Sequence, residues 1–307
     1  TDFEDYGWSS GTYCQKVYQG YTTKVDKDVV ISTWQSLYKM PRKYFDQFGC
    51  VIGDEAHMFK AKSLTGIMTK MHHCKYRFGL TGTLDGTQTH QLVLEGLFGA
   101  AEKVVTTKEL IDKNTLANLK IKCIVLKHPN IRKKMTYAEE LEYIVSNEKR
   151  LDFVVNLLRH LNGNTLCLFQ LVEKHGKILN DKMKGSENVY FVYGGTDTSD
   201  REKIRGLVET HTKSTTIASF GVFSTGINIR NINNIVLASP SKSKIRVLQS
   251  IGRGLRRSDI KDSILIYDIA DDISYNERRN FTLNHFTERL NIYNEEQFDY
   301  DISKVKL

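Results

Sequence analysis

Short apolar runs that end in polar residues recur along the first third of the chain. Three of them have the length and composition of buried parallel strands: Val29–Ile31, Cys50–Ile52 and Tyr76–Leu80. Hydroxyl or acidic residues follow each run: Ser32-Thr33, Asp54-Glu55 and Thr81-Gly82-Thr83. Because ligands of α/β sheets bind beyond the carboxyl ends of strands, this repetition predicts a polar site at one edge of a parallel sheet.

Apolar residues at helical spacing predict helices between these runs. One helix is expected over Ala61–Met71, and a shorter one starts near Trp34. The spacing from Leu141 to Leu158 predicts a long amphipathic helix or a pair of helices.

The second half alternates apolar runs with helical patterns, which predicts a parallel α/β sheet. The expected strands are 166–170, 189–193, 216–220, 235–238 and 264–267, and a further strand is expected at 121–126, before the domain boundary placed near 130. The expected helices are 172–184, 199–209, 244–257 and 276–293. Ser199–Glu202 has the spacing of a capping box, and the acidic end after residue 294 is expected to be peripheral.

Composition is that of a globular protein with a modest basic excess. The 307 residues are 40% hydrophobic and 26% charged, with a net charge of +8. This balance favours polyanionic partners, although a well-solvated basic surface explains it equally. Five scattered cysteines without a C-x-x-C pair predict reduced thiols in a cytoplasmic protein. No apolar stretch approaches the roughly 20 residues of a membrane span, so no membrane association is expected.

The adjacent carboxylates Asp54 and Glu55 are the first candidates for chemistry. In nucleotide hydrolysis one carboxylate holds Mg²⁺, usually through water, while a second orients or deprotonates the attacking water. The structural alternative is an acidic cap at a helix N-terminus.

A second candidate is the stretch Gln249–Arg256. Gln249, Arg253 and Arg256 stand at i, i+4 and i+7, on one face of the expected helix. Arginine forks suit a transferring phosphoryl group, whereas a solvated basic surface is the alternative. Two glycines, at 252 and 254, favour the functional interpretation, because glycine inside a helix lowers its stability.

Small and hydroxyl-rich residues follow two further strands, at Tyr193–Thr196 and Ser224–Gly226. Their amides and hydroxyls can hold phosphate groups of a nucleotide or a nucleic acid. Plain turns are the alternative at both places.

Taken in order, these stretches resemble the motifs of superfamily-two helicases. Asp54–His57 resembles motif II (a DEAH sequence), Thr81–Thr83 motif III, Ser224–Gly226 motif V and Gln249–Arg256 motif VI. Ser32-Thr33 is similar to motif Ic and Tyr193–Thr196 to motif IVa. The resemblance covers nearly the whole chain. It implies two RecA-like parallel-sheet domains in tandem, over 1–129 and 130–307, with the first incomplete at its N-terminus.

The resemblance also implies a role for each matched residue, with ATP and Mg²⁺ as cofactors. Asp54 would hold Mg²⁺ and Glu55 would activate water, whereas Arg253 and Arg256 would reach the γ-phosphate. The residues implied in nucleotide binding or domain coupling are His57, Gly226, Asn228 and Gln249. The residues implied in contacts with the nucleic-acid backbone are Ser32, Thr33, Thr196 and Thr225.

The sequence departs from the family pattern at two points. Asn228 stands where motif V often carries an aspartate, so a ribose contact there would lack a charge. The phosphate-binding loop G-x-x-x-x-G-K-[ST] occurs nowhere in the chain. Because that loop precedes the matched motifs in the family, we expect a truncated chain that binds ATP poorly and is inactive by itself.

The predicted function is the motor core of an ATP-dependent DNA helicase. Within the family the chain is most similar to phage recombination and repair helicases. This resemblance implies that the substrate is branched DNA, such as forks, junctions and R-loops with their RNA–DNA hybrids. It also implies a monomer that works in the cytosol of an infected bacterium. One alternative is a translocase that moves along duplex DNA without separating the strands. Another is a non-catalytic nucleic-acid-binding module that keeps the RecA-like fold.

Overall fold

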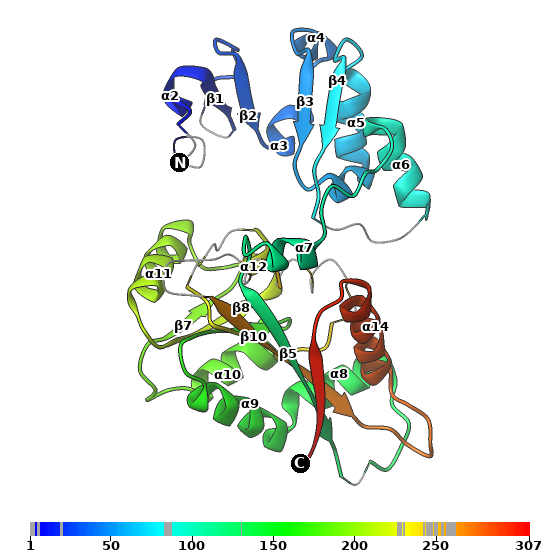
Figure 1. Cartoon of the computed structure of the whole chain (residues 1–307), viewed down its shortest axis with the longest axis vertical. Coiled ribbons are helices and arrows are strands. Elements are labelled where there is room, and N and C mark those ends of the chain that lie inside the picture. The colour runs from blue at the N-terminus through cyan, green and yellow to red at the C-terminus, as the bar shows by residue number, and fades with distance from the viewer. Residues whose placement is uncertain are drawn as a thin grey trace. The chain divides into compact units, whose positions relative to one another are not determined.

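The computed structural model forms two compact units, Thr1–Glu102 and Lys103–Leu307 (Figure 1). It describes residues 4, 7–18, 21–82, 88–129, 131–225, 229, 231–241, 243, 248, 251–252, 255 and 262–307. The division falls before the boundary expected at 129/130, because strand β5 (Asn118–Lys127) pairs along its length with β10 (Ser263–Asp272) in the second unit.

The first unit contains two pairs of parallel strands. Its strands are β1 (Cys14–Val17), β2 (Val29–Ser32), β3 (Cys50–Gly53) and β4 (Tyr76–Gly79). Its helices are α2 (Ser10–Tyr13), α3 (Trp34–Leu37), α4 (Arg42–Phe45), η1 (Ala56–Lys60), α5 (Lys62–Lys70) and α6 (Gln88–Phe98). Strand β1 pairs with β2, and β3 pairs with β4. These elements confirm the three strands and the helix predicted near 61–71.

The core of this unit lies under helix α5. Leu64, Ile67 and Met68 project from α5 onto Phe45 and Cys74. They stand at helical spacing, so a single face of α5 packs into this core.

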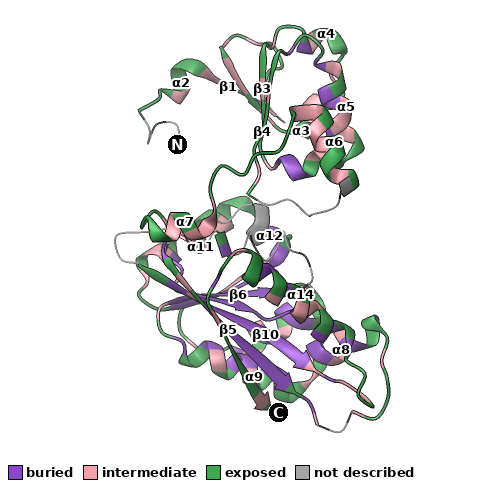
Figure 2. Ribbon diagram, turned by 45° about the vertical axis from the view of Figure 1, so that its right-hand side comes forward, coloured by how far each residue is buried: buried purple, intermediate pink, exposed green. Residues whose placement is uncertain are grey.

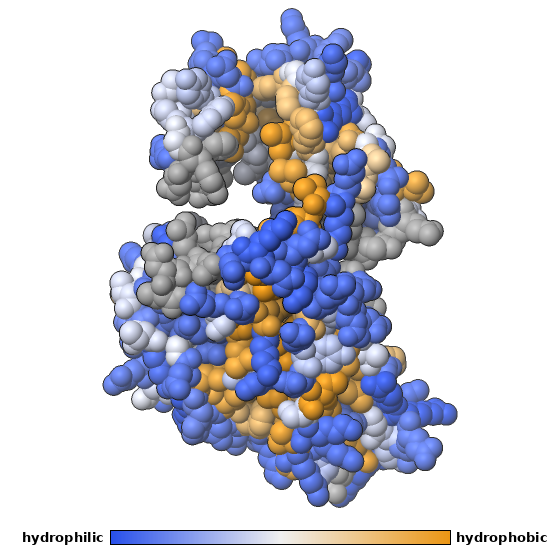
Figure 3. Space-filling model, in the orientation of Figure 1, coloured by the Kyte–Doolittle hydropathy of each residue, from blue (hydrophilic) through white to orange (hydrophobic). Residues whose placement is uncertain are grey.

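The other side of the β3–β4 pair exposes apolar residues. Ile52 is 64% exposed, and Phe78 and Leu80 are more than half exposed. Figure 3 shows apolar surface on the first unit in this region. Parallel strands in α/β proteins are normally covered on both faces, so this exposed face is unusual.

The second unit is built on a seven-stranded sheet with the order β11-β5-β10-β9-β6-β8-β7, and every pairing in it is parallel. Its other strands are β6 (Asn164–Phe169), β7 (Val189–Val192), β8 (Ser214–Ser219), β9 (Asn234–Leu237) and β11 (Tyr300–Lys306). Its helices are α7 (Thr107–Asp112), α8 (Tyr137–Ser146), α9 (Glu148–His160), η2 (Val172–Gly176), α10 (Lys177–Lys182), α11 (Thr198–Thr210), α12 (Phe220–Thr225) and α14 (Phe281–Glu295).

Both faces of this sheet are buried, as Figure 2 shows for its central strands. Alternate residues of β6 point to opposite faces, since side chains alternate along a strand. Leu166 and Leu168 join a core that includes residues of α11, α12 and α14. Cys167 and Phe169 join the opposite core, which includes residues of α9 and α10. The predicted parallel α/β sheet is confirmed.

Two details differ from the prediction. The segment after residue 294 contains strand β11, which pairs with β5 at the sheet edge. The capping box expected at Ser199 is wrong, because α11 already begins at Thr198 with Asp197 as its N-cap residue. A capping box is present instead at Thr136 and Glu139, ahead of α8. Among the described helices, none has the length and apolar character that crossing a membrane requires.

Candidate functional site

The carboxyl ends of β3 and β4 approach each other closely around two glycines. A Cβ atom on Gly53 would lie 2.8 Å from the ring of Phe59, and one on Gly79 would lie 2.9 Å from the ring of Phe98. These distances are shorter than van der Waals contact. Glycine at both positions therefore lets the aromatic pair Phe59–Phe98, with ring centroids 5.1 Å apart, pack directly under the acidic corner.

Asp54 and Glu55 form that corner. The Asp54 side chain is exposed, and its Oδ1 accepts a hydrogen bond from the Glu55 amide at 2.9 Å. Glu55 has φ 49° and ψ 50°, the left-handed conformation that non-glycine residues rarely adopt. Asp54 Oδ2 has no protein partner among the described residues, so an oxygen remains for a hard cation or its water, as magnesium prefers.

His57 links this corner to the end of β4. Its side chain is buried, and Nδ1 lies 3.0 Å from Thr81 Oγ1 and 3.2 Å from Glu55 Oε2. The backbone joins the same two segments, because Ala56 N donates to Leu80 O at 2.8 Å. His57 thus contacts both Glu55, from the same stretch of sequence, and Thr81, from a separate one.

The hydroxyls at the end of β2 are in different surroundings. Ser32 donates to the carbonyl oxygen of Val17 in β1, so its side chain helps to fix the strand pair. Thr33 is exposed at the start of α3, with its Oγ1 3.1 Å from Ser36 Oγ. Of these two hydroxyls, that of Thr33 is the more accessible to a ligand.

In the second unit, Thr196 closes the turn after β7. Its Oγ1 accepts from Tyr193 N at 3.1 Å, which leaves the hydroxyl proton available for an acceptor such as a phosphate. A Cβ on Gly195 would lie 2.7 Å from the Tyr193 ring, so a larger residue there would displace that ring. Thr225 is the last residue of α12, which follows directly on strand β8.

The remaining predicted site residues lie outside the described residues: Gly226, Asn228, Gln249, Arg253 and Arg256. Their apolar neighbours are described. Ile251 and Leu255 are buried in the core that α14 shares, and Leu248 packs against it. Their spacing of three and four residues fits a helix that turns one face to the sheet.

Two buried arginines hold the segment Ala238–Ser241, which follows β9 in the chain. Arg289 on α14 donates to Ser241 O at 2.8 Å and makes a bidentate pair with Asp268 on β10, with Nη2–Oδ1 2.7 Å and Nε–Oδ2 2.8 Å. The Tyr293 hydroxyl donates to the same carboxylate at 2.8 Å. The Asp268 charge raises the pKa of Arg289 against the opposing effect of burial.

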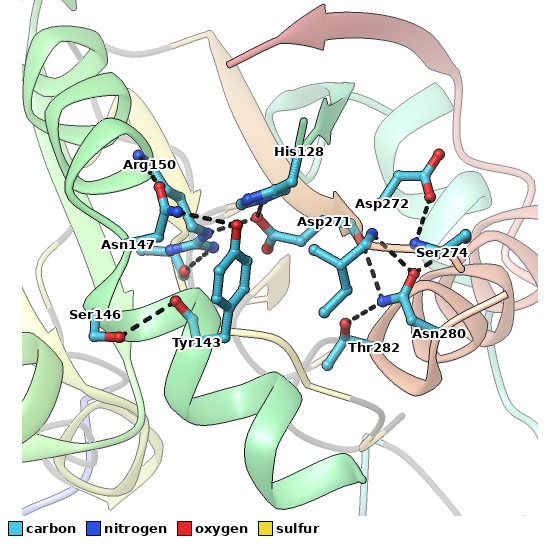
Figure 4. Close-up of polar contacts among 12 residues, drawn as sticks. His128, Tyr143, Ser146, Asn147, Arg150, Asp271, Asp272, Ser274, Asn280 and Thr282 are labelled. Atoms are coloured by element: carbon cyan, nitrogen blue, oxygen red, sulfur yellow. Dashed lines mark hydrogen bonds and ion pairs between the residues drawn. The ribbon is translucent and has the colours of Figure 1, made fainter. Parts of the chain in front are cut away.

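On the other face of the sheet, Arg150 donates to Ala238 O at 2.8 Å and to Asp271 Oδ1 at 2.7 Å (Figure 4). His128 donates from Nε2 to the same oxygen at 2.9 Å. Burial would raise the pKa of Asp271, but the charge of Arg150 and these hydrogen bonds outweigh burial and lower it.

His175 completes this arrangement from η2. Its Nδ1 lies 2.9 Å from Ser239 Oγ, which also accepts from Gln170 N at 3.1 Å. Burial lowers the pKa of His175 to about 3, so the ring is neutral near pH 7. Ala238–Ser241 is therefore anchored from α9, η2 and α14.

Sequence reasoning missed both arginine–aspartate pairs. The available signal was Asp268 and Asp271 inside the apolar run of β10, because a charge in a buried strand requires a partner. Arg150 lies 121 residues before its partner Asp271, and Arg289 lies 21 residues after its partner Asp268. Within the described part of the chain, no group of three His, Cys, Asp or Glu residues is placed to hold a metal ion.

Two family models match the chain. Residues 149–258 match the helicase conserved C-terminal domain, and residues 2–86 match the type III restriction enzyme res subunit. The first match covers the arginine stretch, and the second covers the acidic corner.

Individual relatives give the same result. The chain is 34% identical over its whole length to the ATP-dependent DNA helicase UvsW of Enterobacteria phage T4, and spans 65% of that protein. The crystal structure of T4 UvsW matches 99% of this chain and 64% of its own, with a TM-score of 0.54. Yeast Dbp5, solved with RNA and ADP BeF3, is 14% identical with a TM-score of 0.61 over 96% of this chain and 70% of its own; it shows the fold alone.

Proposed function

We propose that this chain is the motor core of an ATP-dependent DNA helicase. The chain belongs to the superfamily-two helicases, and its two units are RecA-like domains. The observation that carries this proposal is the contact among Glu55, His57 and Thr81 at the carboxyl ends of β3 and β4. A structural acidic cap would not need a buried histidine that joins two strand ends.

In this proposal the acidic corner prepares water for attack. Asp54 would hold Mg²⁺, and Glu55 would orient the attacking water and accept its proton. ATP with Mg²⁺ supplies the phosphate bond whose hydrolysis drives the cycle. His57 couples Glu55 to Thr81, because its Nδ1 lies within 3.2 Å of a side-chain oxygen of each residue.

The second unit contributes the charges that the phosphates require. As the motif resemblance implies, Arg253 and Arg256 would bind the γ-phosphate, and Gln249, Gly226 and Asn228 would complete the nucleotide contacts.

Nucleic acid is held mainly through its backbone. The exposed Thr33 and the hydroxyl proton of Thr196 support phosphate contacts at two separate strand ends, and Ser32 and Thr225 are proposed as further backbone contacts. Such contacts carry little sequence preference. The likeness to UvsW supports branched DNA as substrate, including forks, junctions and R-loops, and a monomer in the cytosol of the phage host.

This chain by itself is proposed to turn over ATP poorly, since it contains no phosphate-binding loop. The exposed apolar face of β3 and β4 supports further polypeptide covering this sheet in the working protein.

The first test is binding of a fluorescent forked DNA, followed by anisotropy at several salt concentrations. We expect affinity that falls steeply with salt, because phosphate contacts release counterions. Absence of binding, or binding that ignores salt, would contradict a nucleic-acid motor. Strand displacement on the same fork by the complete motor distinguishes a helicase from a translocase that moves on duplex DNA.

The second test is ATP hydrolysis with and without that DNA, beside Glu55→Gln and Arg256→Ala. We expect little DNA-stimulated turnover from the unaltered chain. Turnover that disappears in both variants would mean that other residues bind the phosphates, and our account of the missing loop would be wrong.

A further inference from the structure

An exposed pair of aromatic rings follows directly on the backbone-contacting hydroxyl of Thr33. Trp34 starts helix α3 and is 42% exposed, and Tyr38 ends that helix and is 47% exposed. Their ring centroids are 6.5 Å apart with planes at 77°. Single exposed aromatic residues are common, but two rings in contact at the end of a strand form an apolar platform.

The platform is held in place from helix α5. Lys70 Nζ donates to the carbonyl oxygens of Tyr38 at 2.8 Å and Met40 at 2.9 Å, and lies 5.9 Å from the Tyr38 ring centroid. Tyr38 N in turn donates to Trp34 O at 2.8 Å. Fixed rings lose little conformational freedom when a ligand stacks on them.

Positively charged residues follow the aromatic platform in the sequence. Lys39, Arg42 and Lys43 follow Tyr38, and all three are exposed. Within the described part of the molecule, none of the three has an ion-pair partner, in contrast to many lysines of the second unit. Aromatic surface beside uncompensated cations fits a ligand that carries both flat rings and regularly spaced anions.

We propose that Trp34 and Tyr38 stack on bases of single-stranded nucleic acid while Arg42 and its neighbouring lysines bind the phosphates on either side. This deepens the proposed function and rests on it, since the strand would already be positioned by Thr33. An apolar peptide would bury the rings but leave the cations without partners, so the charges favour nucleic acid.

Trp34 provides its own probe, because the chain contains two tryptophans and the other is Trp8. In a Trp8→Phe variant, fluorescence comes from Trp34 alone. We expect titration with an oligothymidylate to quench it, and titration with an abasic oligonucleotide of equal length to leave it nearly unchanged. In the matched Trp34→Phe variant, the remaining Trp8 should show no quenching by either oligonucleotide.

Affinity measured by anisotropy gives the second readout. Trp34→Ala should weaken oligothymidylate binding by about 5- to 150-fold, which corresponds to a stacking contribution of about 1–3 kcal/mol. Binding of the abasic oligonucleotide should not change. Trp34→Phe should keep most of the affinity, which separates loss of the ring from loss of the fold.

The outcomes distinguish the two levels of the proposal. Oligothymidylate binding without quenching, and with equal affinity in Trp34→Ala, would overturn stacking and leave the helicase proposal intact. Failure to bind either oligonucleotide would count against the helicase proposal itself. Quenching by an apolar peptide but not by the oligothymidylate would assign the platform to a protein partner and overturn this inference.

Discussion

Replacing Arg289 with methionine removes the cation that holds Asp268 and Ser241 together inside the second unit. The side chains of Arg289 and Asp268 are 2% and 0% exposed, so water cannot replace the lost partner. The variant keeps most of the side-chain volume but leaves a buried carboxylate with only the Tyr293 hydroxyl as donor. Ser241 O loses its guanidinium donor as well.

The magnitude follows from this burial. Breaking a fully buried ion pair by removing one partner destabilises a protein by about 3–5 kcal/mol. A matched control is Arg205→Met on α11, whose arginine is 35% exposed and pairs with Glu202 and Glu209. Pairs exposed to this degree contribute about 0–1 kcal/mol, because solvent screens them.

Hydrogen exchange read by mass spectrometry measures both variants in the intact chain. Amides of β10 should exchange roughly 10²- to 10⁴-fold faster in Arg289→Met, and less than about 10-fold faster in Arg205→Met. The peptide that covers Ala238–Ser241 should lose protection with β10. Pairing Arg289→Met with Asp268→Leu should restore part of the protection, since apolar replacements of buried pairs are often tolerated.

Two results would refute this reasoning. Equal effects of the two single variants would show that burial does not decide the energy of these pairs. Faster exchange in β10 with unchanged protection at Ala238–Ser241 would show that Arg289 stabilises the sheet without fixing that segment.

Three further predictions concern other parts of the chain. Gly53→Ala should destabilise the first unit by about 1–3 kcal/mol, because its Cβ would lie 2.8 Å from Phe59. Gly66→Ala in α5 is the control, since a Cβ there meets open space and should not destabilise the unit. Urea unfolding followed by tryptophan fluorescence compares the two variants. Acidification below pH 6.5 should destabilise the second unit, because burial lowers the pKa of His175 to about 3 in the folded state, whereas the unfolded residue takes up a proton near pH 6.5. The loss of unfolding free energy should approach about 1.4 kcal/mol per pH unit. Hydrogen exchange in β6, compared at pH 7 and pH 5, should change less in His175→Gln than in the unaltered chain. Glu140→Gln should destabilise the start of α14 by about 1–2 kcal/mol, because this buried carboxylate accepts from the first two amides of that helix at 2.9 Å each; unchanged protection of those amides would contradict this role.

Local pattern was enough to predict the parts of the fold whose residues are close in sequence. The apolar run of β6 and the helical spacing in α5 follow from burial of two faces and of one face, and both elements lie within a few residues of their expected bounds. The polar ends of β3 and β4 were predicted to meet, and His57 and Thr81 do so.

Features that depend on distant residues were not predictable in this way. Strand β11 has an exposed, charged pattern, because it lies at the sheet edge and buries little of its own surface. The partners of Asp268 and Asp271 come from helices on opposite faces of the sheet, and no local pattern names them. The hydroxyl of Ser32 donates to Val17 in the neighbouring strand, a contact that no local pattern predicted.

The left-handed backbone of Glu55 has a consequence for engineering. Glycine adopts this conformation without strain, so Glu55→Gly would relieve roughly 1 kcal/mol of backbone energy while removing the carboxylate. A library screened only for thermal tolerance would therefore enrich glycine or asparagine at this position and discard the proposed base. Variants of this chain selected for robustness need a parallel screen for turnover in the complete motor, or the screen will favour inert proteins.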